Sequence, residues 1–522
     1  MERLTNLDPL LPAEAHLLEA CGKPDRVVVG DGTRPTGKDD DRTIRADFLR
    51  ILLTSPETPL HAKGLRLRGA CIAGVLDLQG VRCEYDITLR SCRLTDPVNL
   101  VNARLQGLHL SDVAASGLSA ENARLDGSLF LRDGTRMEGE VSLAGARISG
   151  DLQICGAELL SDGQDALFAP ALQVDGSVFL GNYPYGEGIT TLVARGTVFL
   201  SSARVGHDMF ISNTAISLNP ERVTGGVFGA TEEHGSDMAL SLGRARIGGI
   251  LSFQDNQIGQ GIVNLAGATV ARFKDEPCGP GANYPIRLDG FRYGDVSRHA
   301  NMHLEARLGW LERRPADTPF TTQPYEQLAG VLSALGHSDD ARTVLMRKER
   351  MLRRENRVTL VERKGYGPRW MLSIAADWIL RATVGYGYRP GRSILMAIAL
   401  MVALGLFFEK AWEAGDMAPN AAPILTSAPW IAATQSHPGN PAAYWSSVGQ
   451  AGQDWETFNG FAYAADLVIP LVSLGQESAW APSTSRSEWG RAGWWIRWFA
   501  KGIGWVIAAL VASAITGVIR QD

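Results

Sequence analysis

Cysteine is scarce in this sequence, and the short motifs that mark common enzyme sites are missing from it. The 522 residues include six cysteines but no Cys-x-x-Cys pair, which is too sparse for a disulfide scaffold and fits a reducing cytosolic environment. There is no GxGxxG after a predicted strand, no GxxxxGK[ST], no HExxH and no GxSxG, so no nucleotide-binding, metalloprotease or serine-hydrolase site is indicated. The sequence therefore favours a non-enzymatic protein, and we expect no catalytic residue, cofactor or metal ion.

Two further features are missing and restrict location and partners. The N-terminal residues MERLTNLDPLLPAEAHLLEACG contain no basic stretch followed by an apolar run, so we expect no cleaved secretory signal and a cytoplasmic N-terminal half. Basic residues do not interleave with aromatic ones as they do in nucleic-acid-binding proteins. The net charge is −5, and we expect no nucleic-acid partner.

Glycine, in contrast, is abundant, with 57 residues, and much of it belongs to a repeat. Each repeat reads small, any, apolar, any, glycine-like, any, apolar, any, apolar, and the period is near 11 residues. The clearest copies begin at Ala123, Ala146, Ala203 and Ala245, and weaker copies begin at Ala70, Val81, Cys92 and Ala103. The alternating apolar residues predict one short strand with one buried face in each unit.

Stacking of these units predicts a mostly β fold, a parallel β-solenoid of about 11-residue half-turns over residues 64–299. Two units would make a turn of roughly 22 residues and give about ten turns. Glycine at the fifth position would let the backbone turn with positive φ, and Cys71, Cys83 and Cys92 would lie in the core. Residues 1–63, with helical patterns near residues 12–20 and 43–53, would form an N-terminal helical cap.

Residues 300–369 change to a helical period and predict a second cap followed by a basic linker. The pattern indicates a helical hairpin that turns at Gly336. Ten Lys or Arg and three Glu then lie between Arg342 and Arg369, a composition that favours contact with anionic lipid headgroups. The residues predicted to make this contact are Arg347, Lys348, Arg353, Arg354, Lys364 and Arg369.

Residues 370–522 form the predicted membrane domain. Two apolar segments, 393–412 and 498–519, are long enough to span a bilayer, and residues 370–382 predict an interfacial helix before them. No Lys or Arg occurs from 411 to 485, so the positive-inside rule predicts cytoplasmic termini and an external loop at 413–490. Arg491, Arg497 and Lys501 oppose this topology. Gly504, Ala508, Ala512 and Thr516 form a stripe of small residues that favours packing on the first span or on another subunit.

Residues 458–476, between the two spans, form an apolar segment that ends in a Leu-Gly turn. A segment this short can re-enter the membrane and line a pore, or it can lie outside as an amphipathic lid. The predicted pore residues are Phe458, Asp466, Pro470, Ser473, Leu474, Gly475 and Gln476. The pentapeptide Thr383–Gly387 matches a potassium selectivity filter. It precedes the first span, however, where we expect only a turn.

Insertions interrupt the repeat at residues 160–170, 182–192 and 217–238. Insertions in a solenoid project as loops, and such loops often bind partners. The residues predicted to form a patch for an unknown protein partner are Tyr183, Tyr185, Glu232 and Glu233.

Several motifs together resemble a known family of bacterial proteins. They are LLPAEAHLLEA, IRADFLRILL, HAKGLRLRGACIAGVLDL, QPYEQLAGVLSALGHSDDAR, GYGYRPGR and LVIPLVSLGQESAW. With the repeats, they are similar to the proteins labelled predicted membrane-associated oxidoreductase. The resemblance implies a bacterial inner-membrane protein related to pentapeptide-repeat solenoids. It also implies oxidoreductase activity, which it assigns to no residue here.

Three functions follow as hypotheses. The preferred one is a membrane-anchored, non-enzymatic scaffold or sensor whose cytoplasmic solenoid binds a partner, with the chain forming a homo-oligomer. The alternative is a homo-oligomeric ion channel in which residues 458–476 line the pore. The third is a membrane oxidoreductase, which follows from the family label alone.

Overall fold

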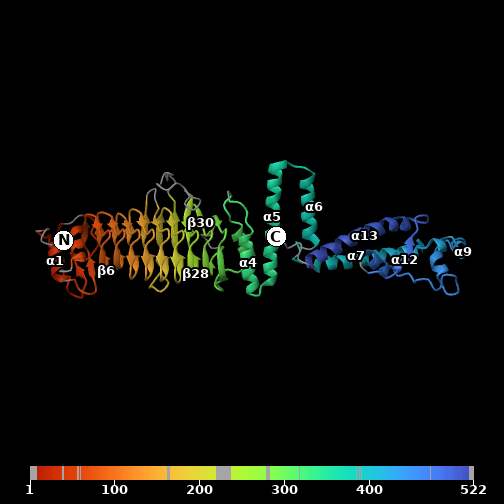
Figure 1. Cartoon of the computed structure of the whole chain (residues 1–522), viewed down its shortest axis with the longest axis horizontal. Helices are drawn as coiled ribbons and strands as arrows, with labels where there is room; N and C mark the ends of the chain where they lie inside the picture. Colours follow the sequence, from red (N-terminus) through yellow and green to blue (C-terminus); the bar gives the residue numbers. More distant parts are fainter. Residues whose placement is uncertain are drawn as a thin grey trace. The chain divides into compact units, whose positions relative to one another are not determined.

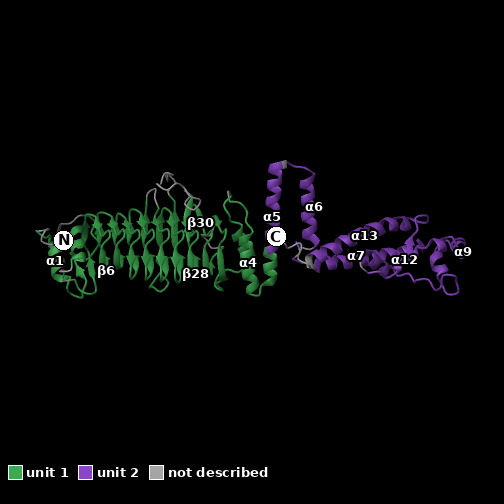
Figure 2. Ribbon diagram, in the orientation of Figure 1, with its two compact units in different colours: residues 1–344 green, residues 345–522 purple. Residues whose placement is uncertain are grey.

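The chain divides into two compact units, residues 1–344 and 345–522 (Figure 2). The computed structural model describes all residues except 1–6, 8, 38–39, 56–57, 59, 162–164, 219–236, 278–282, 317, 384, 387, 390, 471 and 516–522.

Unit 1 is a parallel β-solenoid of about nine turns, with an average turn of about 23 residues (Figure 1). Its strands form one sheet of 15 strands and two sheets of nine, and every pairing within them is parallel. One 11-residue unit supplies a long strand of the first sheet, such as β9 (Arg104–Ser111). The next unit supplies two short strands, such as β10 (Ala114–Ala115) and β11 (Leu118–Ser119), one in each of the other sheets. Every second unit thus contains two short strands, where the sequence predicted one.

The strands of the three sheets have the following bounds. The 15-stranded sheet contains β1 (Val27–Val28), β3 (Leu65–Arg68), β6 (Arg82–Arg90), β9, β12 (Arg124–Leu125), β13 (Leu129–Arg132), β16 (Arg147–Ile148), β17 (Leu152–Cys155), β20 (Gln173–Val174), β21 (Val178–Gly181), β24 (Arg204–Val205), β25 (Met209–Ser212), β28 (Arg246–Gln254), β31 (Thr269–Asp275) and β33 (Arg292–Val296). One nine-stranded sheet contains β2 (Thr43–Arg45), β4 (Cys71–Ala73), β7 (Arg93–Leu94), β10, β14 (Arg136–Met137), β18 (Glu158–Leu160), β22 (Leu192–Arg195), β26 (Thr214–Ser217) and β29 (Gln257–Ile258). The other contains β5 (Leu76–Asp77), β8 (Val98–Asn99), β11, β15 (Val141–Ser142), β19 (Leu167–Phe168), β23 (Val198–Phe199), β27 (Met238–Ser241), β30 (Ile262–Asn264) and β32 (Ile286–Arg287).

A ladder of side-chain hydrogen bonds follows successive turns and shows where they lengthen. The backbone amides of Asp151, Ser177, Asp208 and Ile250 each donate to the side chain one turn earlier, starting from Ser128. The partners are 23, 26, 31 and 42 residues apart. The last three steps contain the three predicted insertions, and these longer turns explain why the solenoid has fewer turns than the ten predicted.

The positive-φ corner is not at the glycine position that the sequence predicted. It lies one residue before the small residue that begins a repeat, as at Asn122 (φ 53°) and Gly145 (φ 65°). Gly74, at the fifth position of the weaker copy that begins at Ala70, has a φ of 93°, but the fifth-position glycines of the clearest copies, such as Gly127, have no positive φ. They are needed for space instead, because a Cβ on Gly127 would lie 2.7 Å from the carbonyl oxygen of Gln106 in the preceding turn.

Two helices and two short strands cover the N-terminal end of the solenoid. They are α1 (Pro12–Ala20) and α2 (Ala46–Thr54), with β1 pairing with β3 and β2 pairing with β4. Strand β2 occupies the first residues of the second predicted helix. A 3-10 turn (Asp40–Arg42) precedes it. The Glu14 side chain, 0% exposed, joins the two helices because it accepts hydrogen bonds from the backbone and side chain of Arg45.

At the other end of the solenoid, α3 (Leu304–Leu311) and α4 (Gln323–Ala334) follow β33. The side chains of Gln323 and Gln327 donate to the carbonyl oxygens of Phe291 and Tyr293, at 3.0 and 2.7 Å. These bonds satisfy acceptors beside the last strand, which has no further strand to pair with among the described residues. Helix α5 (Ser338–Lys364) then leads into unit 2.

Unit 2 is helical. It contains α6 (Pro368–Thr383), α7 (Gly391–Glu413), α8 (Ala422–Leu425), α9 (Ala428–Ser436), α10 (Pro441–Trp445), α11 (Gly460–Val468), α12 (Gln476–Ala479) and α13 (Glu488–Ile515), and a two-stranded sheet of β34 (Met417–Pro419) and β35 (Trp480–Pro482). Helices α7 and α13 are long and apolar enough to cross a membrane. The second of them begins earlier than predicted, because the Trp-rich stretch before 498 is already helical.

Candidate functional site

The first candidate site is the loop inserted after β21 in unit 1. Its ends are joined because the Thr190 amide donates to Asn182 at 3.0 Å and the Thr190 hydroxyl donates to the carbonyl oxygen of Gly181 at 2.8 Å. Between these ends, Tyr185 and Ile189 are 72% and 80% exposed. A loop with fixed ends and two exposed apolar side chains is suited to binding another molecule.

Aromatic contacts hold this loop on the solenoid. The ring of Tyr183 meets the edges of Phe179 and Tyr185, at centroid distances of 5.0 and 5.6 Å. Phe179 in turn stacks on Phe210 of the next turn at 5.2 Å. The Arg132 guanidinium lies 5.0 Å from the centre of the Tyr183 ring. The structure therefore brings the two predicted tyrosines together, whereas Glu232 and Glu233 lie outside the described residues.

The cysteines of the first solenoid turns are core residues. Cys71, Cys83 and Cys92 are each at most 3% exposed, which confirms the predicted core placement. Burial raises the pKa of the Cys92 thiol to about 11. A thiol with so high a pKa is a poor nucleophile at neutral pH.

The second candidate site is in unit 2, where the short helix α11 packs against both long apolar helices. Two glycines allow this approach. A Cβ on Gly460 would lie 2.7 Å from the carbonyl oxygen of Gly405 in α7, and one on Gly504 of α13 would lie 2.5 Å from that of Val468. The stripe of small residues in α13 thus begins against α11 at Gly504, rather than against the first apolar helix. Thr516 lies outside the described residues.

Polar side chains satisfy the first amides of α11. The Glu409 carboxylate of α7 accepts a hydrogen bond from the Gly460 amide at 2.8 Å, and the Asn459 side chain accepts one from the Ala462 amide at 2.9 Å. These bonds pair orphan amides at the start of a helix packed among apolar residues. They fix the start of α11 near the C-terminal end of α7.

The chain returns from the end of α11 in a loop that Asp466 holds. Its carboxylate accepts hydrogen bonds from the backbone amides of Leu474 and Glu477. Gly475 has a left-handed backbone (φ 84°), and Gln476, 3% exposed, donates to Glu456 and Thr457. Most of the predicted pore residues therefore stabilise the turn itself.

This turn borders an open cavity of about 420 Å³. Both acidic and basic side chains line it, together with prolyl and seryl residues of the loop. The lining includes Asp466, Pro470, Ser473, Glu477, Arg497 and Lys501. Four of the predicted pore residues do not line it: Phe458, Leu474, Gly475 and Gln476.

Sequence analysis missed the role of Glu477. Its carboxylate accepts hydrogen bonds from Arg497 at 2.7 Å and pairs with Lys501, both on α13. Arg497 and Lys501 are four residues apart and so share one helix face. The four-residue spacing of these two cations was the signal available in the sequence, since one acidic residue can neutralise two cations placed in this way.

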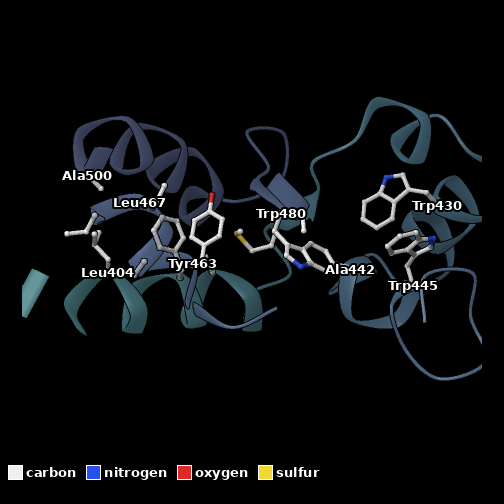
Figure 3. Packing of buried hydrophobic residues seen from close by; sticks show 14 of the residues in the cluster. Leu404, Trp430, Ala442, Trp445, Tyr463, Leu467, Trp480 and Ala500 are labelled. Carbon is white, nitrogen blue, oxygen red and sulfur yellow. The ribbon is translucent and has the colours of Figure 1, made fainter. Parts of the chain in front are cut away.

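The segment between α7 and α13 has an aromatic core of its own. Figure 3 shows Tyr463 and Trp480 in one part of it and Trp430 and Trp445 in another. Phe458 lies on this core, with its ring stacked on Trp412 at 4.8 Å. The segment predicted as a loop is thus a packed subdomain that anchors the start of α11.

The outward faces of the two long helices are apolar. Large apolar residues are exposed along both α7 and α13. They include Ile394, Leu395, Met396, Ile398, Val402 and Leu406 on α7, and Trp495, Trp498, Phe499, Ile503, Trp505 and Val506 on α13. A surface of this composition is suited to a hydrocarbon environment.

The basic residues of α5 have several different environments. Arg353 and Arg357 pair with Asp377 of α6, at 3.8 and 3.2 Å. Lys348 is 3% exposed and lies 3.5 Å from Glu349. Of the other residues predicted to contact lipid, Arg347 is half-buried and Arg354 and Arg369 are exposed, and the side chain of Lys364 lies outside the described residues.

The filter-like pentapeptide has a turn in place of a pore lining. Gly385 and Tyr386 both have positive φ, and Tyr386 is buried with its hydroxyl donating to Asp377 at 2.9 Å. Val384 and Gly387 lie outside the described residues. In the described part of this motif, Tyr386 therefore holds the chain that follows α6 against that helix.

Comparisons with protein-family models, with curated proteins and with solved structures found no match. The resemblance to membrane-associated oxidoreductases therefore rests on the quoted sequence motifs alone.

Proposed function

We propose that this protein is a membrane-anchored scaffold or sensor, whose β-solenoid binds a partner protein and catalyses no reaction. The observation that carries the proposal is the loop at Asn182–Thr190, which has fixed ends and exposes Tyr185 and Ile189. Tyrosine is common at the centre of protein interfaces because it buries a large area at a small cost in entropy. The oxidoreductase activity implied by the resemblance is not part of the proposal.

The proposal places the chain in a bacterial inner membrane, with α7 and α13 spanning it and both termini in the cytoplasm. The apolar faces of both helices support the two spans, and the scarcity of basic residues from 411 to 485 supports the topology. Arg497 and Lys501 oppose this topology under the positive-inside rule, but both pair with Glu477, which offsets part of their positive charge. Arg354 and Arg369 would contact anionic lipid.

A photo-crosslinking residue at position 185 tests partner binding in cells that make the full chain. We expect a discrete crosslinked adduct that disappears when Ile189→Asp is added. The same crosslinker at Val448, 96% exposed in unit 2, is the matched control and should not give that adduct. A chain that yields no adduct from position 185 would not be a scaffold of this kind.

The position of α11 between α7 and α13 favours a second candidate, a homo-oligomeric pore. In this arrangement α11 and the turn after it would re-enter the membrane beside both spans. Several copies would place residues 469–476 around an axis. The support is the close contact of Gly460 with α7 and of Val468 with α13.

Conductance in planar bilayers separates the two functions. A pore predicts ion flux that changes in Gln476→Ala, while the exposed-site control Ser447→Ala conducts like the unmodified protein. A purified oligomer with no conductance under any voltage would exclude the pore and leave the scaffold as the remaining candidate.

A further inference from the structure

One register position on the 15-stranded sheet is occupied by arginine in most turns of the solenoid. The residues that pair with one another at this position through nine successive strands are Arg82, Arg104, Arg124, Arg147, Gln173, Arg204, Arg246, Thr269 and Arg292. We call them the arginine row. Seven of its members are arginines, and all seven are exposed.

The stability of the solenoid does not explain this row. Neighbouring members are hydrogen-bonded strand partners, such as Arg124 with Arg147 and Arg204 with Arg246. Like charges directly opposite each other on adjacent strands destabilise a sheet. A repeated arginine in this register therefore costs stability, and a ligand of opposite charge would relieve the repulsion.

The row is neutralised only at its N-terminal end. Arg82 pairs with Glu84 at 3.6 Å, and Arg104 pairs with Asp126 at 3.0 Å. Among the described residues, no hydrogen bond or ion pair reaches the guanidinium groups of the remaining arginines. These are Arg124, Arg147, Arg204, Arg246 and Arg292.

The free part of the row borders a shallow groove of about 660 Å³. Arg204, Arg246 and Asp175 line it, and Gly206 and Gly248 lie beside the two arginines. These glycines have no side chain to separate a ligand from the sheet, and a Cβ on Gly248 would lie 2.2 Å from the carbonyl oxygen of Gly206. A bound chain could therefore approach the sheet closely beside the two guanidinium groups.

We propose that the arginine row, from Arg124 to Arg292, binds an acidic segment of a partner protein through its Asp and Glu carboxylates. The inference rests on the proposed scaffold function and names the chemistry of the partner. Guanidinium groups bind carboxylates through paired hydrogen bonds. Strands of a sheet are about 4.8 Å apart, so the free row extends for about 29 Å. Carboxylates on one face of an α-helix recur about every 5.4 Å, which is close to the spacing of the row.

The shape of the charged surface favours a linear acidic segment over a lipid surface or a nucleic acid. The row is single file, and the exposed positions two residues after its members contain no Lys or Arg. These positions are Glu84, Gln106, Asp126, Ser149, Asp175, Gly206, Gly248, Ala271 and Gly294. A flat anionic bilayer and a nucleic-acid duplex, which carries one charge about every 1.7 Å, would both need a broader basic surface than a single row of arginines.

Fluorescence anisotropy with a labelled oligoglutamate tests the proposal. The probe has about twelve residues, enough to follow the free row even when extended at about 3.3 Å per residue. The full chain, in micelles of an uncharged detergent, should bind it with an affinity that falls as salt rises. The double variant Arg204→Gln, Arg246→Gln should bind about tenfold or more weakly, a loss of ~1.4 kcal/mol or more.

The double variant Arg104→Gln, Arg136→Gln is the matched control, because both arginines are already paired with acidic residues. It should bind the probe like the unmodified chain, and the circular dichroism of both variants should match that of the unmodified chain. Equal binding by all three proteins, or no binding at low salt, would overturn the proposal. Tighter binding of duplex DNA or of phosphatidylglycerol vesicles would assign the row to a nucleic acid or to a membrane instead.

The crosslinking at position 185 is independent of this measurement. An adduct from position 185 together with no oligoglutamate binding would reject the arginine row and retain the scaffold. Oligoglutamate binding without any adduct from position 185 in cells would retain the arginine row as a carboxylate-binding surface and reject the scaffold.

Discussion

The Glu477 carboxylate accepts two hydrogen bonds from Arg497, with one oxygen 3.0 Å from Nε and 2.7 Å from Nη2. Lys501 pairs with the same oxygen. Glu477 follows the turn after α11, and the two cations are on α13, so the contact ties the turn to the second apolar helix. Both guanidinium and carboxylate are about 80% buried, which makes the interaction stronger than an exposed ion pair.

The first prediction is that Glu477→Gln destabilises unit 2. The amide leaves two neighbouring cations without a counter-charge and should lower the free energy of unfolding by about 1.5–3 kcal/mol. Thermal unfolding of the full chain in detergent, followed by tryptophan fluorescence, measures the loss. Glu413→Gln is the control, because its pair with Lys410 is exposed and should contribute less than about 1 kcal/mol. Equal stability of both variants would contradict this account of the turn.

The second prediction concerns the contact between α13 and α11. Gly504→Val would place its Cβ 2.5 Å from a backbone oxygen, which cannot move without displacing α11. We expect a loss of about 1–3 kcal/mol, as in overpacked cores, together with faster proteolysis between residues 458 and 476. Gly502→Val is the matched control on the same helix, because no atom lies within 4 Å of its Cβ position. If Gly502→Val were the more damaging change, α11 would not pack on Gly504.

The features that the sequence revealed depend on short local patterns, whereas the features that it did not reveal depend on contacts between distant residues. Strand positions and the two apolar helices follow from short periodic patterns, so the solenoid and both long helices were predictable. The positive φ of Asn122 and the role of Gly127 depend on the neighbouring turn, which a single repeat does not contain. The pairing of Glu477 with α13 joins residues 20 apart across a turn whose path only the fold defines. The arginine row required the pairing register, because insertions shift its members by unequal steps.

The third prediction is an acid-sensitive N-terminal cap. Burial raises the pKa of the Glu14 carboxyl, but hydrogen bonds from the Arg45 side chain and from the Leu11 and Arg45 amides outweigh it and leave the pKa below its ordinary value of 4.5. A carboxyl with a depressed folded pKa contributes stability above its unfolded pKa and loses it as pH falls through the folded pKa. The cap should therefore loosen below about pH 4.5.

Hydrogen exchange of residues 12–20, measured between pH 6 and pH 3 and corrected for the intrinsic rate, follows this change. Glu14→Gln should raise exchange already at pH 6 and remove most of the pH dependence. Glu19→Gln is the control, because Glu19 is exposed on the same helix and the described residues include no partner for it. Identical pH profiles for Glu14→Gln and the unmodified chain would rule out Glu14 as the responsive group.

The fourth prediction concerns a buried ion pair near the C-terminal end of the solenoid. Arg307 of α3 lies 2.6 Å from Asp275 of β31, and both side chains are at most 5% exposed. Asp275→Asn leaves a buried guanidinium without a counter-charge and should cost about 3–5 kcal/mol. Urea unfolding of the full chain, followed by far-ultraviolet circular dichroism, measures the shift. Asp295→Asn is the control, because its partner Arg272 is half-exposed and the loss should stay near 1 kcal/mol or less.

The double variant Asp275→Leu, Arg307→Met separates the net contribution of this pair from the cost of breaking it. Removal of both charges leaves no unpaired ion, and apolar side chains of similar size often replace a buried pair at little cost. We therefore expect the double variant to unfold at a higher urea concentration than Asp275→Asn. A double variant less stable than the single one would mean that the charges themselves, and not only their pairing, hold α3 against the last turns.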